Sequence, residues 1–435
     1  MVTPMRTSTS TTILVLLSAV ACREITTLQQ SNPGAIEASK VYVPSNALLL
    51  ANGAVADFEC AYTRYVVGSG IFTDELANAI AQNANYDYDR RTILTNGAYG
   101  TAACGNTTGA NQQPPIYTTL SVARGSADSV IARLKEWTDA QMPTGVNRSK
   151  LLGQSYAYAG YSLTLLGEGM CSAAINVGPE LTPAQLFAEA KDRFDSAVVY
   201  ANAANPADAT MRNFATLGRA RVLLNLGQNA AAAADAAAIP AGFSVTTSTD
   251  AVNARRANFS FLAINQNNWA TVDPTFRGLT IGGNPDPRVA VTNTGRNGTA
   301  AGAQIWTPDK YPAVTTVMPI AKYAEAQLIL AETRAASGDL TGAATAINAA
   351  RNTRTGMPQY SSAGQTQAQV LAQIIEERRR ELFLEGHRLG DIHRYNLPLV
   401  PAAGTPYSGG GQYGTQTCFP LPDVERLNNP NIPKP

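Results

Sequence analysis

The chain has 435 residues, of which 45% are hydrophobic and 15% are charged, so it can bury a sizeable core, and its length alone allows two or three domains. The formal net charge is +1, and no basic patch is interleaved with aromatic residues. Nucleic acid is therefore excluded as a partner, because its binding requires a concentrated positive field.

The first 21 residues predict a signal peptide. They carry one positive charge, Arg6, an apolar stretch from Ile13 to Val20, and small residues directly before Cys22. This stretch is about half of the roughly 20 residues that a membrane-spanning helix needs. Cleavage before Cys22 predicts a bacterial lipoprotein anchored by acyl chains on this cysteine, although Ala19 stands where the bacterial lipobox usually has Leu. Ordinary signal cleavage is the alternative.

The remaining cysteines are Cys60, Cys104, Cys171 and Cys418. An even number behind a secretion signal predicts two disulfides, for which three pairings are possible. We favour Cys60 with Cys104, because they are near in sequence, and Cys171 with Cys418, because that bond would hold the C-terminal tail. Buried free thiols are the alternative. No C-x-x-C spacing is present, so we expect no metal site.

Aromatic residues in two loop-like segments are candidates for ligand contacts. Tyr86 and Tyr88 would share a face in an extended chain and stand next to Arg90, at the start of a loop-like segment over residues 87–115. Aromatic rings offer flat apolar faces with a polar handle, which suit a sugar ring or a peptide side chain. The predicted ligand-binding residues are Tyr86, Tyr88, Arg90, Asn267 and Trp269, and packing of the rings inside the protein is the alternative.

Two segments repeat one pattern around a glycine turn, at Gly227 and at Gly338, with Leu or Ala at helical spacing before the turn and Ala after it. The pattern predicts tetratricopeptide-like helical hairpins with small residues where the helices cross. A third hairpin is expected from residues 157–167 and a second helix over 183–203, separated by an insertion that holds Cys171. A fourth would include a helix over residues 367–385.

The predicted fold class is mainly α: a tetratricopeptide-like scaffold of helical hairpins with long loop-rich insertions and a few short strands. We expect one domain over residues 22–435. Its helical repeats would cover about 150–238 and 316–395, a loop-rich insertion about 239–320, and an extended tail 396–435. The insertion is rich in Asn, Gly, Thr and Pro, with strand-like pieces at 259–262 and 289–291.

Catalytic motifs are absent from the sequence. It contains no H-E-x-x-H, G-x-S-x-G or P-loop, and nothing selects the two opposed carboxylates of a glycosidase. The only histidines are His387 and His393. We interpret His387 and Glu385 as a structural pair at a helix end, and we predict no catalytic residue, no cofactor and no metal.

The segment from Glu376 to Arg388 is dense in alternating charge, and Asp391 and Arg394 follow it. Glu377, Glu381 and Glu385 recur at every fourth position and so share one helix face. Gly386 stands where helices commonly end in a left-handed residue. A charge run of this kind is ordinarily a solvated, self-paired helix.

The same string, E-R-R-x-E-L-x-x-E-G-x-R followed by D-x-x-R, resembles the C-terminal signature of the SusD-like (RagB/SusD) nutrient-uptake lipoproteins. In that family the signature is structural and holds the C-terminal helix on the repeat scaffold. The resemblance implies a non-catalytic lipoprotein of the outer membrane that faces the cell surface. It would capture an oligosaccharide, or a peptide, and deliver it to a SusC-like TonB-dependent transporter.

Ligand residues in the family come from variable loops, so none can be transferred by motif. Two other functional classes stay open. One is a structural or assembly protein of the cell surface built on helical repeats, and the other is a surface hydrolase of the same nutrient.

Overall fold

The computed structural model describes residues 37–105, 113–300 and 302–434. Cys22 and the predicted signal peptide, residues 1–21, lie outside the described residues. The fold is mainly helical with a few short strands, which confirms the predicted fold class. Within the described ranges, no helix has the length and apolar character to cross a membrane.

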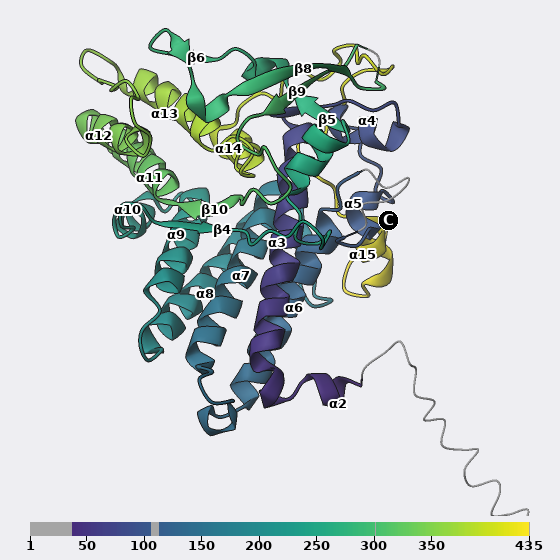
Figure 1. Ribbon diagram of the computed structural model, residues 1–435, viewed down its shortest axis with the longest axis vertical. Coiled ribbons are helices and arrows are strands. Elements are labelled where there is room, and N and C mark those ends of the chain that lie inside the picture. Colours follow the sequence, from purple (N-terminus) through teal and green to yellow (C-terminus); the bar gives the residue numbers. More distant parts are fainter. Residues whose placement is uncertain (1–36, 106–112, 301, 435) are drawn as a thin grey trace, which may run out of the picture.

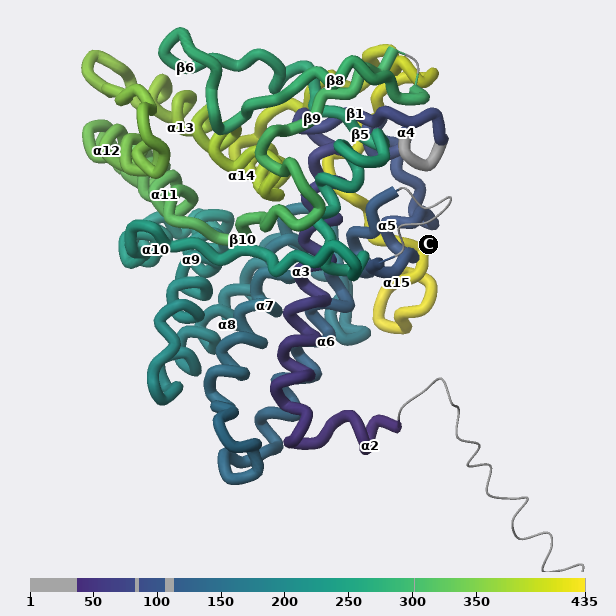
Figure 2. Tube along the Cα trace, in the orientation of Figure 1, coloured from purple at the N-terminus to yellow at the C-terminus, as the bar shows by residue number. Residues whose placement is uncertain are grey.

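A row of helices fills the lower half of the molecule in Figures 1 and 2. Each helix packs on the next in the series α6–α7–α8–α9–α10, and α3 packs on both α6 and α7. The row consists of α3 (Ala47–Phe72), α6 (Tyr117–Glu136), α7 (Arg148–Gly169), α8 (Pro183–Ala203), α9 (Ala209–Asn225) and α10 (Asn229–Ala237).

Helix α8 begins and ends where the sequence predicts. Thr182 and Gln185 form a capping box at its start: the Gln185 side chain accepts a hydrogen bond from the Thr182 N–H at 2.8 Å. Small residues bring the helices together, as the pattern indicates. A Cβ at Gly218 of α9 would lie 2.4 Å from the ring of Phe194 in α8, so only glycine fits at this crossing.

The long helices α3 and α6 are absent from the prediction. Every residue from Phe58 to Phe72 in α3 is buried, so this part of the helix has no polar face and its sequence shows no apolar stripe. Both favoured disulfides are present. Cys60–Cys104 ties a loop to α3, and Cys171–Cys418 ties the tail to the segment after α7.

The second group of helices packs on the first through α10 and α11. It consists of α11 (Tyr323–Ala336), α12 (Leu340–Arg351), α13 (Gln367–Glu381) and α14 (Arg388–Tyr395). The predicted glycine turns have the left-handed conformation, with φ of +72° at Gly227 and +86° at Gly338.

Helix α13 ends at Glu381, so the expected helix over residues 367–385 is too long. The chain turns through Leu384, with φ of +53°, and Gly386, with φ of +73°. The Leu384 N–H donates to the carboxyl group of Glu75 at 2.8 Å. This tertiary hydrogen bond takes the donor that a continuing helix would use.

The segment between α10 and α11 contains most of the strands, and Figure 1 shows it as a layer above the helical row. The strands form antiparallel pairs: β1 (Leu76–Asn78) with β5 (Ala270–Val272), β2 (Ala173–Ala174) with β3 (Glu180–Leu181), β4 (Ser244–Thr246) with β10 (Pro319–Lys322), β6 (Thr280–Ile281) with β7 (Asn284–Pro285), and β8 (Val291–Asn297) with β9 (Gln304–Pro308).

The strand expected at residues 259–262 is wrong. This segment enters a helical turn over Phe261–Gln266, because the Asn258 side chain accepts a hydrogen bond from the Phe261 N–H at 3.0 Å and so starts the turn. At residues 289–291 only Val291 belongs to a strand, since Val289 closes a 3₁₀ turn. The remaining short helices are α2 (Ala38–Val41), α4 (Asn83–Asp89), α5 (Ala98–Thr101) and α15 (Asp423–Asn428).

Candidate functional site

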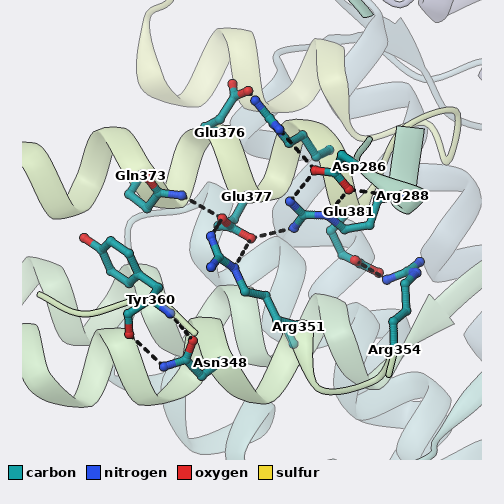
Figure 3. Close-up of polar contacts among 12 residues, drawn as sticks. Asp286, Arg288, Asn348, Arg351, Arg354, Tyr360, Gln373, Glu376, Glu377 and Glu381 are labelled. Carbon is teal, nitrogen blue, oxygen red and sulfur yellow. Dashed lines mark hydrogen bonds and ion pairs between the residues drawn. The ribbon is translucent and has the colours of Figure 1, made fainter. Parts of the chain in front are cut away.

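The charged C-terminal segment forms a buried network of ion pairs, which Figure 3 shows in close-up. Glu377 is 1% exposed and contacts two arginines from other segments, Arg288 at 2.5 Å and Arg351. Burial opposes the ionisation of Glu377, but these two cations outweigh it and lower its pKa. This face of α13 therefore has the structural role that the resemblance implies, and the general interpretation of a charge run as a solvated, self-paired helix does not hold for it.

Glu381 and Glu385 also pair with cations from other segments, whereas Glu376 pairs with Arg379 and Arg380 of its own helix. Lys322 contacts Glu381 at 3.0 Å and Glu385 at 2.7 Å, and Lys310 also contacts Glu385. Arg378 donates two hydrogen bonds to Asp391, of 2.9 and 2.8 Å. The network fastens α13 and α14 to the insertion and to α12, so its role is structural.

The predicted pair of His387 and Glu385 is also wrong, because each has other partners. The buried His387 ring lies 3.4 Å from Arg221 and 4.0 Å from Glu325. Burial, together with Arg221 and other nearby cations, lowers the pKa of His387 well below its ordinary value, so the ring is neutral. Among the described residues, no group of three or more His, Cys, Asp or Glu side chains could hold a metal ion.

Two of the predicted ligand segments meet at one edge of the molecule, although about 180 residues separate them. Antiparallel pairing of β1 with β5 brings the chain before α4 next to Trp269, whose carbonyl accepts a hydrogen bond from the Ala79 N–H at 2.9 Å. Figure 1 shows α4 beside β5 at the upper right. We call this region, with the tail residues 404–414 that pack on it, the α4 edge.

Tyr86 and Arg90 lie at the α4 edge and contact the tail. The Tyr86 ring is half-buried and meets the Tyr407 ring edge-on, with 5.5 Å between the centroids. Arg90 pairs with Asp87 at 3.1 Å and donates to the carbonyl oxygen of Gly410 at 3.2 Å. These contacts connect α4 to a loop more than 300 residues away in sequence.

Tyr88 belongs to the core, in contrast to the prediction. Residues 86 and 88 lie in helix α4 rather than in an extended chain, so their side chains point to different sides. Tyr88 is 1% exposed, its hydroxyl donates to the Pro114 carbonyl oxygen at 2.7 Å, and its ring packs edge-on against Phe419.

Asn267 and Trp269 are half-buried beside β5. The Trp269 ring lies 6.2 Å from that of Phe259 and packs against the core, so it offers only part of its surface to a ligand. The Asn267 side chain makes no hydrogen bond within the described part of the chain, which leaves its amide available.

The tail contributes aromatic residues that the sequence prediction missed, Tyr407 and Tyr413, whose rings lie 5.2 Å apart. Their position on either side of the glycine run Gly409–Gly411 could have identified them. A Cβ at Gly409 would lie 2.7 Å from the Tyr407 ring and 3.0 Å from that of Tyr86, so this glycine lets the backbone run close over both rings.

Comparison with known proteins identifies the family that the chain resembles. Residues 300–428 match the model of the SusD family. A SusD superfamily protein from Bacteroides thetaiotaomicron shares the fold with a TM-score of 0.69 at 15% identity, over 89% of this chain and 98% of its own. The C-terminal part of the chain is therefore similar in sequence to the SusD family, and the chain has a SusD-like fold.

Two further structures support the SusD-like fold. A SusD-like carbohydrate binding protein from Bacteroides vulgatus has a TM-score of 0.65 at 16% identity, over 89% of this chain and 96% of its own. Surface glycan-binding protein A from Bacteroides thetaiotaomicron, solved with laminarihexaose, has a TM-score of 0.64 at 15% identity, over 88% of this chain and 98% of its own. No curated protein matches the sequence.

Proposed function

We propose that this SusD-like protein binds oligosaccharides at the α4 edge and delivers them to a SusC-like TonB-dependent transporter. The protein would be anchored in the outer membrane through Cys22 and would face the cell surface. Binding requires no bond-breaking step, so no residue is assigned a catalytic role.

The observation that carries this proposal is the grouping of the half-buried Tyr86 and Tyr413 with Arg90 on one edge of the fold, where the buried Tyr407 packs edge-on against both rings. Tyrosine rings pack against the apolar faces of sugars, and their hydroxyls, with the guanidinium of Arg90, donate to sugar oxygens. Similarly folded proteins are described as carbohydrate binding, as laminarin binding, and as a complex with laminarihexaose, which favours a glycan over a peptide.

Calorimetric titration of the intact chain with laminarihexaose and a panel of other neutral oligosaccharides tests binding. Tyr86→Ala and Trp269→Ala should each weaken the affinity about fivefold to tenfold, because each removes one aromatic contact. Tyr42→Ala, a matched loss of an exposed tyrosine next to α2, should leave it unchanged. Unchanged affinity in both test variants would reject the α4 edge as the site, and binding of none of the sugars would reject the function.

Anchoring and delivery need separate tests. Cys22→Ser should release the protein from the outer-membrane fraction, because no acyl chain can then be attached. A large barrel protein should co-purify with the wild-type chain from detergent-solubilised membranes. Retention of Cys22→Ser in the membrane would contradict the anchor, and repeated purification without a barrel would contradict the transporter partner.

A further inference from the structure

Arg91 is a buried arginine that has no acidic partner. It follows α4 with a left-handed φ of +57°, and its side chain is 1% exposed beneath the tail. Among the described residues no carboxylate lies within ion-pair distance of it. Its Nη2 donates to the carbonyl oxygen of Pro401, and its Nε has no hydrogen-bond partner among the described residues.

Three other buried arginines of this protein are paired with acids. Arg288, Arg351 and Arg378 each contact at least one carboxylate. Arg64 also lacks a carboxylate, but it donates to the Thr63 hydroxyl and the Ala254 carbonyl oxygen, both at 3.0 Å. Arg91 therefore differs from these arginines because it lacks a carboxylate partner and also has an unpaired Nε.

The protein offsets the charge of Arg91 only in part. Burial lowers its pKa, while Tyr413 and Asp89 act in the opposite direction. The guanidinium lies over the Tyr413 ring at 4.8 Å, a cation–π contact. Asp89 is itself buried, which raises its pKa to about 7, and its carboxylate already accepts hydrogen bonds from the Asn78 N–H and the Tyr407 hydroxyl. An anion brought next to Arg91 would gain from the missing compensation.

Arg91 lines a cavity of about 430 Å³ between the end of α14 and the tail. Leu397, Leu399 and Ala402 form an apolar wall. The polar side chains of the lining include Asn396, Thr415 and Thr417, which make no hydrogen bond within the described part of the chain. A volume of this size falls in the range of small-molecule sites, roughly 300 to 1,000 Å³.

We propose that this cavity binds the carboxylate of an acidic sugar, so that uronic-acid-containing glycans are a ligand class of this protein. The carboxylate would pair with the guanidinium of Arg91, and Asn396, Thr415 and Thr417 would contact the sugar hydroxyls. A single cation suits the single negative charge of a carboxylate better than the double charge of a phosphate. This inference rests on the oligosaccharide binding proposed above and narrows its ligand class.

Calorimetry on the intact chain, purified in detergent and at constant ionic strength, tests the proposal with sodium D-glucuronate, D-glucose and sodium acetate. Glucuronate should bind at least tenfold more tightly than glucose, which lacks the charge, and than acetate, which lacks the ring. Arg91→Gln should weaken glucuronate binding at least tenfold. Arg212→Gln, the same charge change at an exposed position of α9, should leave it unchanged.

A second variant keeps the test decisive if Arg91→Gln fails to fold. Ala402 is exposed and lines the cavity, so Ala402→Trp should fill the space and abolish glucuronate binding without lowering the thermal unfolding temperature. Equal affinities for glucuronate and glucose, or for glucuronate and acetate, would overturn the proposal. Wild-type glucuronate affinity in Ala402→Trp would also overturn it.

Laminarihexaose, which is neutral, separates this proposal from the broader function. If laminarihexaose binds and glucuronate does not, only the proposal of an acidic-sugar cavity is rejected. If glucuronate binds and laminarihexaose does not, the acidic-sugar cavity is supported, and the natural ligand should be sought among acidic glycans. Binding of neither would reject both.

Discussion

The C-terminal network and the α4 edge both bury charged side chains, but they treat these charges in opposite ways. In the network each buried acid contacts one or more cations, and the pKa of Asp286 is lowered to about 2 because Arg288 and Arg380 outweigh the effect of its burial. At the α4 edge, Asp89 and Arg91 are buried without an ion pair, and burial dominates the pKa of each.

This difference suggests different roles for the two regions: the paired charges stabilise the fold, and the unpaired charges are candidates for ligand binding. A buried charge that already has an ion-pair partner stabilises the fold only together with that partner. A buried charge without a partner can still form a favourable ion pair with a ligand of opposite charge. The string that resembles the SusD family signature therefore belongs to the scaffold, and the binding site proposed above consists of residues that no signature marks.

The largest loss of stability is expected at Glu377, the acid that forms ion pairs with two buried arginines. Glu377→Ala should lower the free energy of unfolding by about 4 kcal/mol, because it leaves Arg288 and Arg351 buried with a reduced set of partners. Urea titration followed by circular dichroism measures this loss. Glu376→Ala is the matched control on the same helix: its side chain is 35% exposed, and the substitution should cost less than about 1 kcal/mol. Equal losses in the two variants would contradict the comparison.

The scaffold was the more predictable part of the molecule. Thr182, Gln185 and the glycines at 227 and 338 mark helix ends by local chemistry, so α8 and the turns of two hairpins could be placed from sequence. Helix α3 could not, because every residue from Phe58 to Phe72 is buried and this part of the helix shows no apolar periodicity. The end of α13 depends on a hydrogen bond to Glu75, some 300 residues earlier, which no local pattern encodes.

The second prediction concerns Glu75, a buried acid that connects to the signature without an ion pair. Burial raises its pKa to about 8, and Asp74 adds to this effect while the Leu384 N–H opposes it. Between pH 4.5 and 8 the folded state then keeps a proton that the unfolded state has lost, so the free energy of unfolding contributed by Glu75 falls as pH rises.

Glu75→Gln removes this titration while preserving the shape of the protonated side chain. The variant should match the wild type near pH 5 and exceed its stability by on the order of 3 kcal/mol at pH 8. Urea titrations of both proteins over this pH range measure the difference, in which the contributions of other groups cancel. A difference that stays constant with pH would show that Glu75 is ionised in the folded protein.

The α4 edge was predicted only in part, for a physical reason. Aromatic residues next to polar ones in loops identified Tyr86 and Arg90, but the same pattern also selected Tyr88, which is in the core. Its inward direction follows from the helical conformation of α4, and a segment of seven residues gives too short a periodicity to reveal it. Arg91 escaped notice because the missing acidic partner is a property of the fold.

The smallest loss of stability is expected for a substitution of Arg90. The comparison with the network is direct here, because the same change, arginine to glutamine, can be made at Arg90 and at Arg351. Arg90 is 26% exposed in its pair with Asp87, and Arg351 is 6% exposed in its pair with Glu377. Arg90→Gln should lower the free energy of unfolding by less than about 1 kcal/mol, because water replaces the lost contact, whereas Arg351→Gln should cost about 3 kcal/mol. For the affinity for laminarihexaose we expect the opposite: Arg90→Gln should weaken binding, and Arg351→Gln should leave it unchanged. If Arg351→Gln weakened binding as strongly as Arg90→Gln, the network would be coupled to the α4 edge, and scaffold and site could no longer be treated as separate.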